Sequence, residues 1–325
     1  MHYWSHPLIG VVTLLIFGAV TTAPGMSQVA SINHDPDAAR LVTSDIPNFW
    51  RVFDRASLTS AADLFQREYL DAGSLGLHDF TRSRIQTGRG LAATVAARPR
   101  YYAAIRQNMM ALDATPSIKE SVRQAFRGLK ALYPEAVFPD VYFLIGRLNS
   151  AGTTSSNGLL IGVEMNARDP GTPVEELSNW ERAVTGQIAN LPHIVAHELV
   201  HVQQQGNTAE TLLAQALREG SADFIGEMIS GGTINRVQRS YGDDHERALW
   251  EEFSAVMHGT DTSHWLFQGD RSIDRPADLG YYVGYKICEA FYQRATNKPD
   301  AVRRIVQVTD ADAFLRQSNY SGGGR

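Results

Sequence analysis

Apolar side chains recur at intervals of three and four residues through most of this chain. Positions at these intervals share one face of a helix, so the pattern predicts amphipathic helices rather than strands. Helical spacing covers residues 45–133 and is clearest in segments 61–70 and 117–126, which we interpret as scaffold. Beyond Pro192 the same spacing predicts helices over residues 192–205, 210–230, 243–258, 277–295 and 300–307.

The stretch that follows Pro134 departs from this pattern. Residues 141–145 and 159–163 are short runs rich in β-branched, aromatic and aliphatic side chains, and we expect each to form a strand. Residues 149–158 between them are polar and predict a loop, while Gly162 would leave the backbone of the second strand accessible. The predicted fold class is α+β, mostly α, with a small β-sheet and an N-terminal helical region.

Composition narrows the class of protein further. Of the 325 residues, 43% are hydrophobic and 20% are charged, which excludes a largely disordered chain or a multispan membrane protein. The net charge of −5 and the lack of a basic stripe argue against nucleic acid as a partner. Because Cys288 is the only cysteine, no internal disulfide can form, and any metal must rest on histidines and carboxylates.

An apolar run over residues 8–20 marks the N-terminus. It is shorter than the ~20 residues of a spanning helix and fits the apolar centre of an export signal, although no Lys or Arg precedes it. We therefore expect export to the periplasm or the extracellular space, with membrane association through an uncleaved signal as the alternative. The predicted organisation is a signal peptide or signal anchor at 1–30, a helical N-terminal region at 31–135, a core region at 136–318 and a disordered tail at 319–325.

The segment around residue 197 carries the strongest chemical signal. On a helix, His197 and His201 lie one turn apart on the same face, so both imidazoles can reach a single ion. Glu198 lies about 100° further round, beside the ion rather than on it. A carboxylate in that place can take a proton from an activated water molecule without filling the open coordination position.

A second acidic motif follows on a later stretch of helical character. A catalytic zinc site with two histidines needs a third protein ligand, and Glu219 suits this role. Asp223 falls one turn later on the same face, where it can accept the remaining ring N–H of a ligand histidine, and we pair it with His197. Glu227 is a weaker alternative as third ligand. His193 is excluded, because the outer two of three successive histidines would lie ~12 Å apart along the helix axis.

These residues resemble the gluzincin metallopeptidases, in which His-Glu-x-x-His on one helix is completed by Glu-x-x-x-Asp on the next. More narrowly, the chain is similar to a predicted zinc-dependent protease family related to the gliding-motility lipoproteins of bacteria. The segments that carry this likeness are residues 197–204, 219–223 and 280–285. The resemblance covers roughly residues 137–295 and implies a zincin-like catalytic region at 136–318 with zinc as cofactor. It also implies that residues 159–163 are an edge strand that receives a peptide or protein substrate. No cysteine follows the apolar run, which departs from the lipoprotein members.

The same resemblance draws attention to two tyrosines. A donor opposite Glu198 would stabilise the charge that develops on the substrate's carbonyl oxygen, and Tyr281 and Tyr285 are the candidates, with Tyr281 first. Gly284 would let their helix approach a neighbour closely. The resulting hypothesis is a zinc-dependent peptidase with Glu198 as general base. A catalytically inactive envelope interaction protein of the same fold and a structural domain stabilised by zinc are the alternatives.

Overall fold

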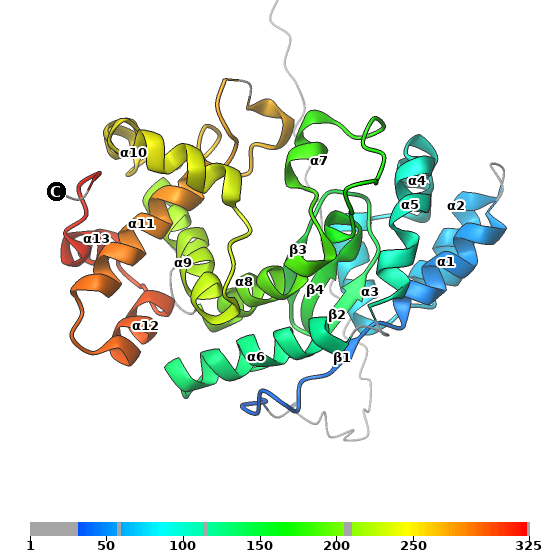
Figure 1. Ribbon diagram of the computed structural model, residues 1–325, viewed down its shortest axis with the longest axis horizontal. Coiled ribbons are helices and arrows are strands. Elements are labelled where there is room, and N and C mark those ends of the chain that lie inside the picture. The colour runs from blue at the N-terminus through cyan, green and yellow to red at the C-terminus, as the bar shows by residue number, and fades with distance from the viewer. Residues whose placement is uncertain (1–31, 57–59, 113–115, 205–209, 273, 324–325) are drawn as a thin grey trace, which may run out of the picture. The chain divides into compact units, whose positions relative to one another are not determined.

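A computed structural model describes residues 32–56, 60–112, 116–204, 210–272 and 274–323. The predicted signal at 1–30 and the last two residues of the predicted tail lie outside the described residues. From Asn33 onward the chain forms one compact unit that is mostly helical and contains a small mixed sheet (Figure 1). The α+β, mostly α class predicted from the sequence is therefore confirmed.

The N-terminal helices are α1 (Asp45–Arg55), α2 (Ala61–Leu64), α3 (Leu75–Phe80), α4 (Gly88–Ala97), α5 (Pro99–Met110) and α6 (Pro116–Leu132), with π-helical turns η1 (Phe65–Leu70) and η2 (Thr81–Ile85). The later helices are α7 (Asn179–Val184), α8 (Leu191–Gln203), α9 (Leu212–Ser230), α10 (Arg236–Val256), α11 (Leu279–Arg294), α12 (Lys298–Val306) and α13 (Ala311–Ser318), with 3-10 turns η3 (Val163–Asn166), η4 (Ile188–Asn190) and η5 (Gly269–Arg271). Helix α10 begins at Arg236, before the helix expected from residue 243, but its backbone is kinked at His245, close to the expected start. The short helix α13 was not predicted.

The sheet has four strands. They are β1 (Leu41–Val42), β2 (Val141–Leu144), β3 (Gly152–Ser155) and β4 (Gly158–Gly162). Their spatial order is β1-β2-β4-β3, in which β1 and β4 run parallel to β2, and β3 is antiparallel to β4. Helix α3 packs against β2 and β4, and helix α8 packs against β3 and β4. The sheet thus connects the N-terminal helices to the helix that carries both candidate ligand histidines.

Strand β3 corrects two predictions. The loop expected over residues 149–158 contains this strand, which is polar and half-buried and forms because its main chain pairs with β4 across a tight turn. Residues 159–163 are not an edge strand. They fall mostly in β4, which lies between β2 and β3 and is buried along its whole length. The strand at the sheet edge beside α8 is therefore β3.

Three buried tyrosines attach the N-terminal helices to the rest of the core. The Tyr69 hydroxyl donates to the carbonyl of Ile145 at 2.8 Å and accepts from the same residue's N–H at 2.9 Å. Tyr102 donates to the carbonyl of Gly146, and Tyr101 donates to the carbonyl of Glu164, both at 2.8 Å. Main-chain groups next to β2 and β4 are thus satisfied by side chains from α5 and η1.

Helices α9 and α11 touch through glycines. A Cβ atom on Gly284 would overlap the carbonyl oxygen of Ala216, and one on Gly220 would overlap the backbone of Gly284 and Tyr285. The prediction that Gly284 permits a close approach is therefore confirmed. Through these two glycines, α11, which carries Tyr281, lies in direct contact with α9, which carries Glu219. None of the described helices is both long enough and apolar enough to cross a membrane.

Candidate metal centre

Helix α8 is enclosed on nearly all sides. Pro192 lies in its first turn, where the missing N–H leaves no helical hydrogen bond unmade. Helices α6 and α9 and strands β3 and β4 pack around it. A Cβ on Gly226 of α9 would come within 3.2 Å of the main-chain nitrogen of His197, so only a small residue lets the two helices lie this close. Side chains that leave α8 toward α9 therefore enter a narrow space.

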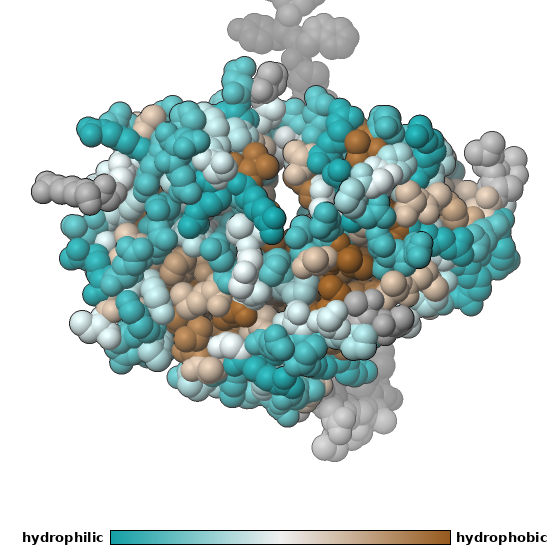
Figure 2. All heavy atoms as spheres, in the orientation of Figure 1, coloured by the Kyte–Doolittle hydropathy of each residue, from teal (hydrophilic) through white to brown (hydrophobic). Residues whose placement is uncertain are grey.

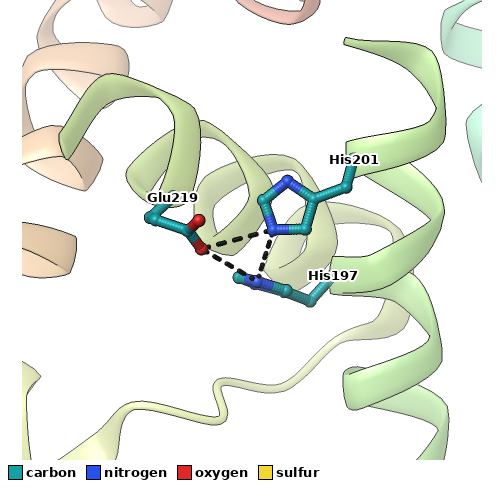
Figure 3. Close-up of side chains that lie close together, drawn as sticks. All are labelled: His197, His201 and Glu219. Atoms are coloured by element: carbon teal, nitrogen blue, oxygen red, sulfur yellow. Dashed lines mark hydrogen bonds and ion pairs between the residues drawn. The ribbon is translucent and has the colours of Figure 1, made fainter. Parts of the chain in front are cut away.

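Two histidines from α8 and one glutamate from α9 converge in that space (Figure 3). The Nε2 atoms of His197 and His201 are 3.0 Å apart. The Oε2 atom of Glu219 lies 3.6 Å from the first and 3.3 Å from the second. Ligand atoms bound ~2.0–2.1 Å from one tetrahedral zinc ion are about 3.3 Å apart, which this triangle matches. These three residues could hold a metal ion, and their donor set is one that zinc accepts.

The imidazole of His197 is held from behind by a carboxylate. Its Nδ1 lies 2.8 Å from Oδ1 of Asp223, and the other oxygen of Asp223 accepts from the side-chain amide of Asn235 at 2.6 Å. A carboxylate can only accept, so Nδ1 donates to Asp223 and Nε2 faces Glu219, where a metal ion would take the place of a proton.

The imidazole of His201 is held by an amide. Its Nδ1 lies 2.8 Å from Oε1 of Gln204, whose Nε2 donates to the carbonyl of Arg218 at 2.7 Å and to the hydroxyl of Ser221 at 2.8 Å. The donor side of the amide is occupied on α9, so its oxygen faces the ring and Nδ1 is again protonated. Both Nε2 atoms therefore face the centre of the triangle, where either a proton or a metal ion can bind them.

The histidines and carboxylates of the cluster shift one another's pKa values. Burial alone would lower the pKa of His197, but hydrogen bonds with Asp223 and Glu219 outweigh it and the pKa is raised well above its usual value. Burial would raise the pKa of Glu219, but the two imidazoles outweigh it, and the pKa is lowered. The carboxylates thus favour a positive charge at the centre of the triangle.

Glu198 lies beside the triangle and takes no part in it. Its carboxylate packs against β3 so closely that a Cβ on Gly152 would lie 2.6 Å from Oε1. Burial raises the pKa of Glu198, although the positive charges of His201, His197 and Arg84 oppose the shift. A buried carboxylate with a raised pKa is suited to accepting and returning a proton.

The cluster lies in a cavity of about 630 Å³. A space-filling view shows the molecule hollowed near the centre of one face (Figure 2). Strand β3 and the loop before it form one wall, and Tyr281 of α11 lies in another. The carboxylate of Asp270 accepts from the main-chain N–H of Trp180 at 2.8 Å and from the hydroxyl of Ser178 at 3.0 Å. Turn η5 and helix α7 are thereby joined beside the cavity, which Trp180 and Gly269 line.

The two tyrosine candidates lie in different environments. Tyr281 lines the cavity, and its ring stacks on His197 with centroids 6.3 Å apart. Burial and the negative charge of Glu219 raise the pKa of Tyr281, so its hydroxyl keeps its proton and can donate. Tyr285 is outside the residues that line this cavity. Its ring lies 3.6 Å beneath the guanidinium of Arg239 and packs edge-on against Phe224.

The alternatives for metal ligands lie outside the cluster. His193 is hydrogen-bonded through Nδ1 to the hydroxyl of Ser230 at 2.9 Å. Among the described residues, the only group of potential ligands found close enough to share an ion is His197, His201 and Glu219, so Glu227 is not part of it.

Two residues near the site were given no role from the sequence, although Gln204 belongs to the segment 197–204 that carries the family resemblance. Gln204 orients His201, and Arg84 reaches the cavity from η2, a segment far from the motifs. Gln204 directly follows the histidine helix, so its position could have suggested a role. No local signal connects Arg84 to residues more than sixty positions later.

Comparison with known proteins gives a match to a family model. Residues 42–322 match the family model described as gliding motility protein GldB. The match begins well before residue 137 and therefore includes most of the N-terminal helical region. No curated protein and no solved structure matches the chain.

Proposed function

The chain belongs to the family of gliding motility protein GldB, and we propose that it is a zinc-dependent hydrolase of zincin-like fold that cleaves peptide bonds. The relationship to gliding-motility proteins expected from the sequence is confirmed, whereas zinc, hydrolysis and the peptide substrate are proposals. The observation that supports them most is the triangle of His197, His201 and Glu219 with Glu198 beside it in a cavity.

Each side chain has a distinct role in this proposal. His197, His201 and Glu219 would hold zinc, which as a Lewis acid would make an attacking water molecule acidic enough to ionise near neutral pH. Glu198 takes the proton from that water and returns it to the leaving amine. Asp223 and Gln204 keep the two imidazoles in the tautomer that presents Nε2.

Tyr281 is our choice as the donor to the developing oxyanion. It lies in the cavity wall next to His197 and keeps its proton. Tyr285 was the second candidate from the sequence. Its contacts with Arg239 and Phe224 support a packing role instead.

A place in the cell envelope fits both family and sequence. The family model is one of gliding-motility lipoproteins, which suggests an envelope-associated protein. We propose export through the N-terminal apolar run, with a peptide or protein of the envelope as substrate.

The proposal is tested by measuring zinc per chain and cleavage of casein or mixed peptides. We expect about one zinc per chain in the wild type and in Glu198→Gln, with activity in the wild type alone. His201→Ala should lose the metal, because two ligands rarely retain zinc. Tyr281→Phe should keep zinc and lower kcat by about 10²–10³-fold if its hydroxyl stabilises the oxyanion.

Two results would contradict the proposal. Full activity in Glu198→Gln would remove the assigned base, and full zinc occupancy in His201→Ala would place the metal elsewhere. Zinc binding by a wild type that cleaves nothing in a broad peptide library would favour the inactive interaction protein.

A further inference from the structure

Arg84 is an arginine in the cavity wall whose positive charge acts on the Glu198 carboxylate but which forms no ion pair with a described residue. It lies near the end of η2, more than a hundred residues before the histidine motif in the sequence. In the fold it lines the same cavity as Glu198. Its one side-chain hydrogen bond to a described residue runs from Nη2 to the hydroxyl of Thr153 on β3, at 3.2 Å. No carboxylate of the described residues lies within ion-pair distance of it.

The absence of a direct ion pair with a described residue sets Arg84 apart from two nearby arginines. Arg82, two residues earlier, pairs with Asp79, and Arg98 pairs with Glu181 at 2.7 Å. The Nε atom of Arg84 is shielded from solvent and makes no hydrogen bond. A partly desolvated guanidinium with unused donors is costly unless an anion completes it.

The position of Arg84 relates it to the reaction centre. Thr153, its hydrogen-bond partner, directly follows Gly152, against which the Glu198 carboxylate packs. Residues along a strand are ~3.3 Å apart, so a peptide lying on the edge of β3 would pass Arg84 within one or two residues of the bond next to Glu198. The carbonyl of Arg84 also accepts from the side chain of Asn149 at 3.0 Å, which fixes the backbone of η2 at this end of β3.

From this placement we propose that Arg84 binds a carboxylate of the substrate, within about two residues of the bond that is cleaved. The inference rests on the proposed hydrolase function. Guanidinium and carboxylate form paired, geometrically specific hydrogen bonds, which an ammonium group cannot reproduce. The carboxylate belongs either to an acidic side chain or to the C-terminus of a short peptide. In both cases Arg84 determines specificity.

The experiment uses matched peptides and two readouts. The peptides differ only in Glu against Gln at one position, or in a free acid against an amide at the C-terminus. Binding to the zinc-loaded Glu198→Gln protein is measured by calorimetry, and cleavage by the wild type is measured as kcat and KM. We expect one of the two carboxylate-bearing forms to bind about 10–100-fold more tightly than its neutral match.

Three variants isolate the arginine. Arg84→Gln should abolish that preference and leave binding of the neutral peptides unchanged, whereas Arg84→Lys should restore only part of it. Arg218→Gln is the control, because Arg218 also lines the cavity and forms no ion pair with a described residue, but its side chain is exposed. It should leave the preference intact. Circular dichroism and zinc content verify that each variant is folded.

Two outcomes overturn the inference. One is a wild type that binds acidic and neutral peptides equally, and the other is an equal loss in Arg84→Gln and Arg218→Gln, which would indicate only the general charge of the cavity. If acidic peptides bind tightly and through Arg84 but are not cleaved, the carboxylate site is supported and the proposed hydrolase function is contradicted.

Discussion

Each ligand imidazole depends on one partner behind it. Asp223 holds His197 with a charged group, and Gln204 holds His201 with a neutral one. A hydrogen bond to a carboxylate raises the basicity of the imidazole more than a bond to an amide does. The two histidines are therefore unequal, and His197 is expected to bind the metal more strongly.

Replacing the carboxylate behind His197 tests this difference. Asp223→Asn should weaken zinc affinity or the rate of hydrolysis by ~10–100-fold, because the amide cannot accept from both His197 and Asn235 in the same way. Zinc affinity is measured by competition with a chelator. Glu227→Gln is the matched control on the same helix and should bind zinc as the wild type does. An unchanged affinity in Asp223→Asn would contradict the assigned role.

Away from the cavity, Glu164 is a buried acid that makes stability depend on pH. Burial raises its pKa to about 7 from the usual 4.5, and one of its carboxylate oxygens has no hydrogen-bond partner. Between about pH 4.5 and pH 7, Glu164 is therefore protonated in the folded protein and ionised in the unfolded chain. Stability contributed by the protonated form is present below about pH 4.5 and is lost as the pH rises to about 7.

The variant Glu164→Gln removes this titration while its oxygen can still accept from the N–H of Leu148. Relative to the variant, the wild type should lose up to about 3 kcal/mol of unfolding free energy between pH 4.5 and pH 7. Urea unfolding at several pH values measures the difference. A difference between the two proteins that stays constant with pH would mean that Glu164 does not titrate in this range.

How much of the site is predictable depends on where its residues lie. His197, Glu198 and His201 share one helix, so their mutual geometry follows from helical spacing alone. Glu219 and Asp223 share the next helix, and their spacing identifies them as a second local motif. Arg84 reaches the cavity only through the packing of η2 beside β3, which no local pattern encodes.

At the scale of elements, the site depends on how closely three helices approach one another. Gly226 brings α9 to α8, and the pair Gly220 and Gly284 brings α11 to α9. If α11 moved outward, Tyr281 would leave the cavity wall while the histidine triangle stayed in place. The α9–α11 contact therefore connects packing to the proposed oxyanion donor.

A methyl group at this contact should be poorly tolerated. Gly284→Ala would place a carbon on the backbone carbonyl of Ala216, which cannot rotate away, so we expect a loss of about 3 kcal/mol in unfolding free energy. The matched control is Gly128→Ala on α6, where the nearest atom would lie at an ordinary 3.5 Å. That change should be neutral or should stabilise by about 0.5–1 kcal/mol, because alanine favours helix. Equal effects in the two variants, measured by urea unfolding, would contradict this view of the contact.

Elements differed in how well the sequence predicted them. Helices α8, α9 and α11 have apolar residues at helical spacing and recognisable ends, so local signals were sufficient. Strand β3 has neither apolar alternation nor β-branched bulk at every position. It is a strand because β4 provides a partner, and such pairing is a tertiary property.

At the scale of the whole molecule, the core does not separate at residue 135. Buried side chains from the N-terminal helices and from α8 to α13 belong to one continuous hydrophobic cluster. Strand β1 pairs with β2, and the tyrosines of α5 and η1 satisfy main-chain groups near β2 and β4. The predicted boundary between a helical region and a catalytic region is thus crossed by strand pairing, packing and hydrogen bonds.

We therefore expect residues 136–325 alone to lack a cooperative fold, because the truncation exposes the apolar face of the sheet and leaves buried carbonyls unpaired. Residues 33–325 should unfold in a single transition. Thermal unfolding followed by circular dichroism compares the two chains. A sharp transition in the shorter chain would mean that the N-terminal helices are dispensable for folding.

The contact between Gly152 and Glu198 gives a way to sort relatives of this protein. The three atoms nearest to a Cβ at position 152 would all belong to the side chain of Glu198 and none to the backbone, so the side chain rather than the main chain would have to shift. A relative with a larger residue in place of Gly152 would keep its fold and both histidines. Its counterpart of Glu198, the proposed proton acceptor, would nevertheless be displaced. A search for silent members of the family that retain every motif residue should therefore begin at the position that corresponds to this glycine.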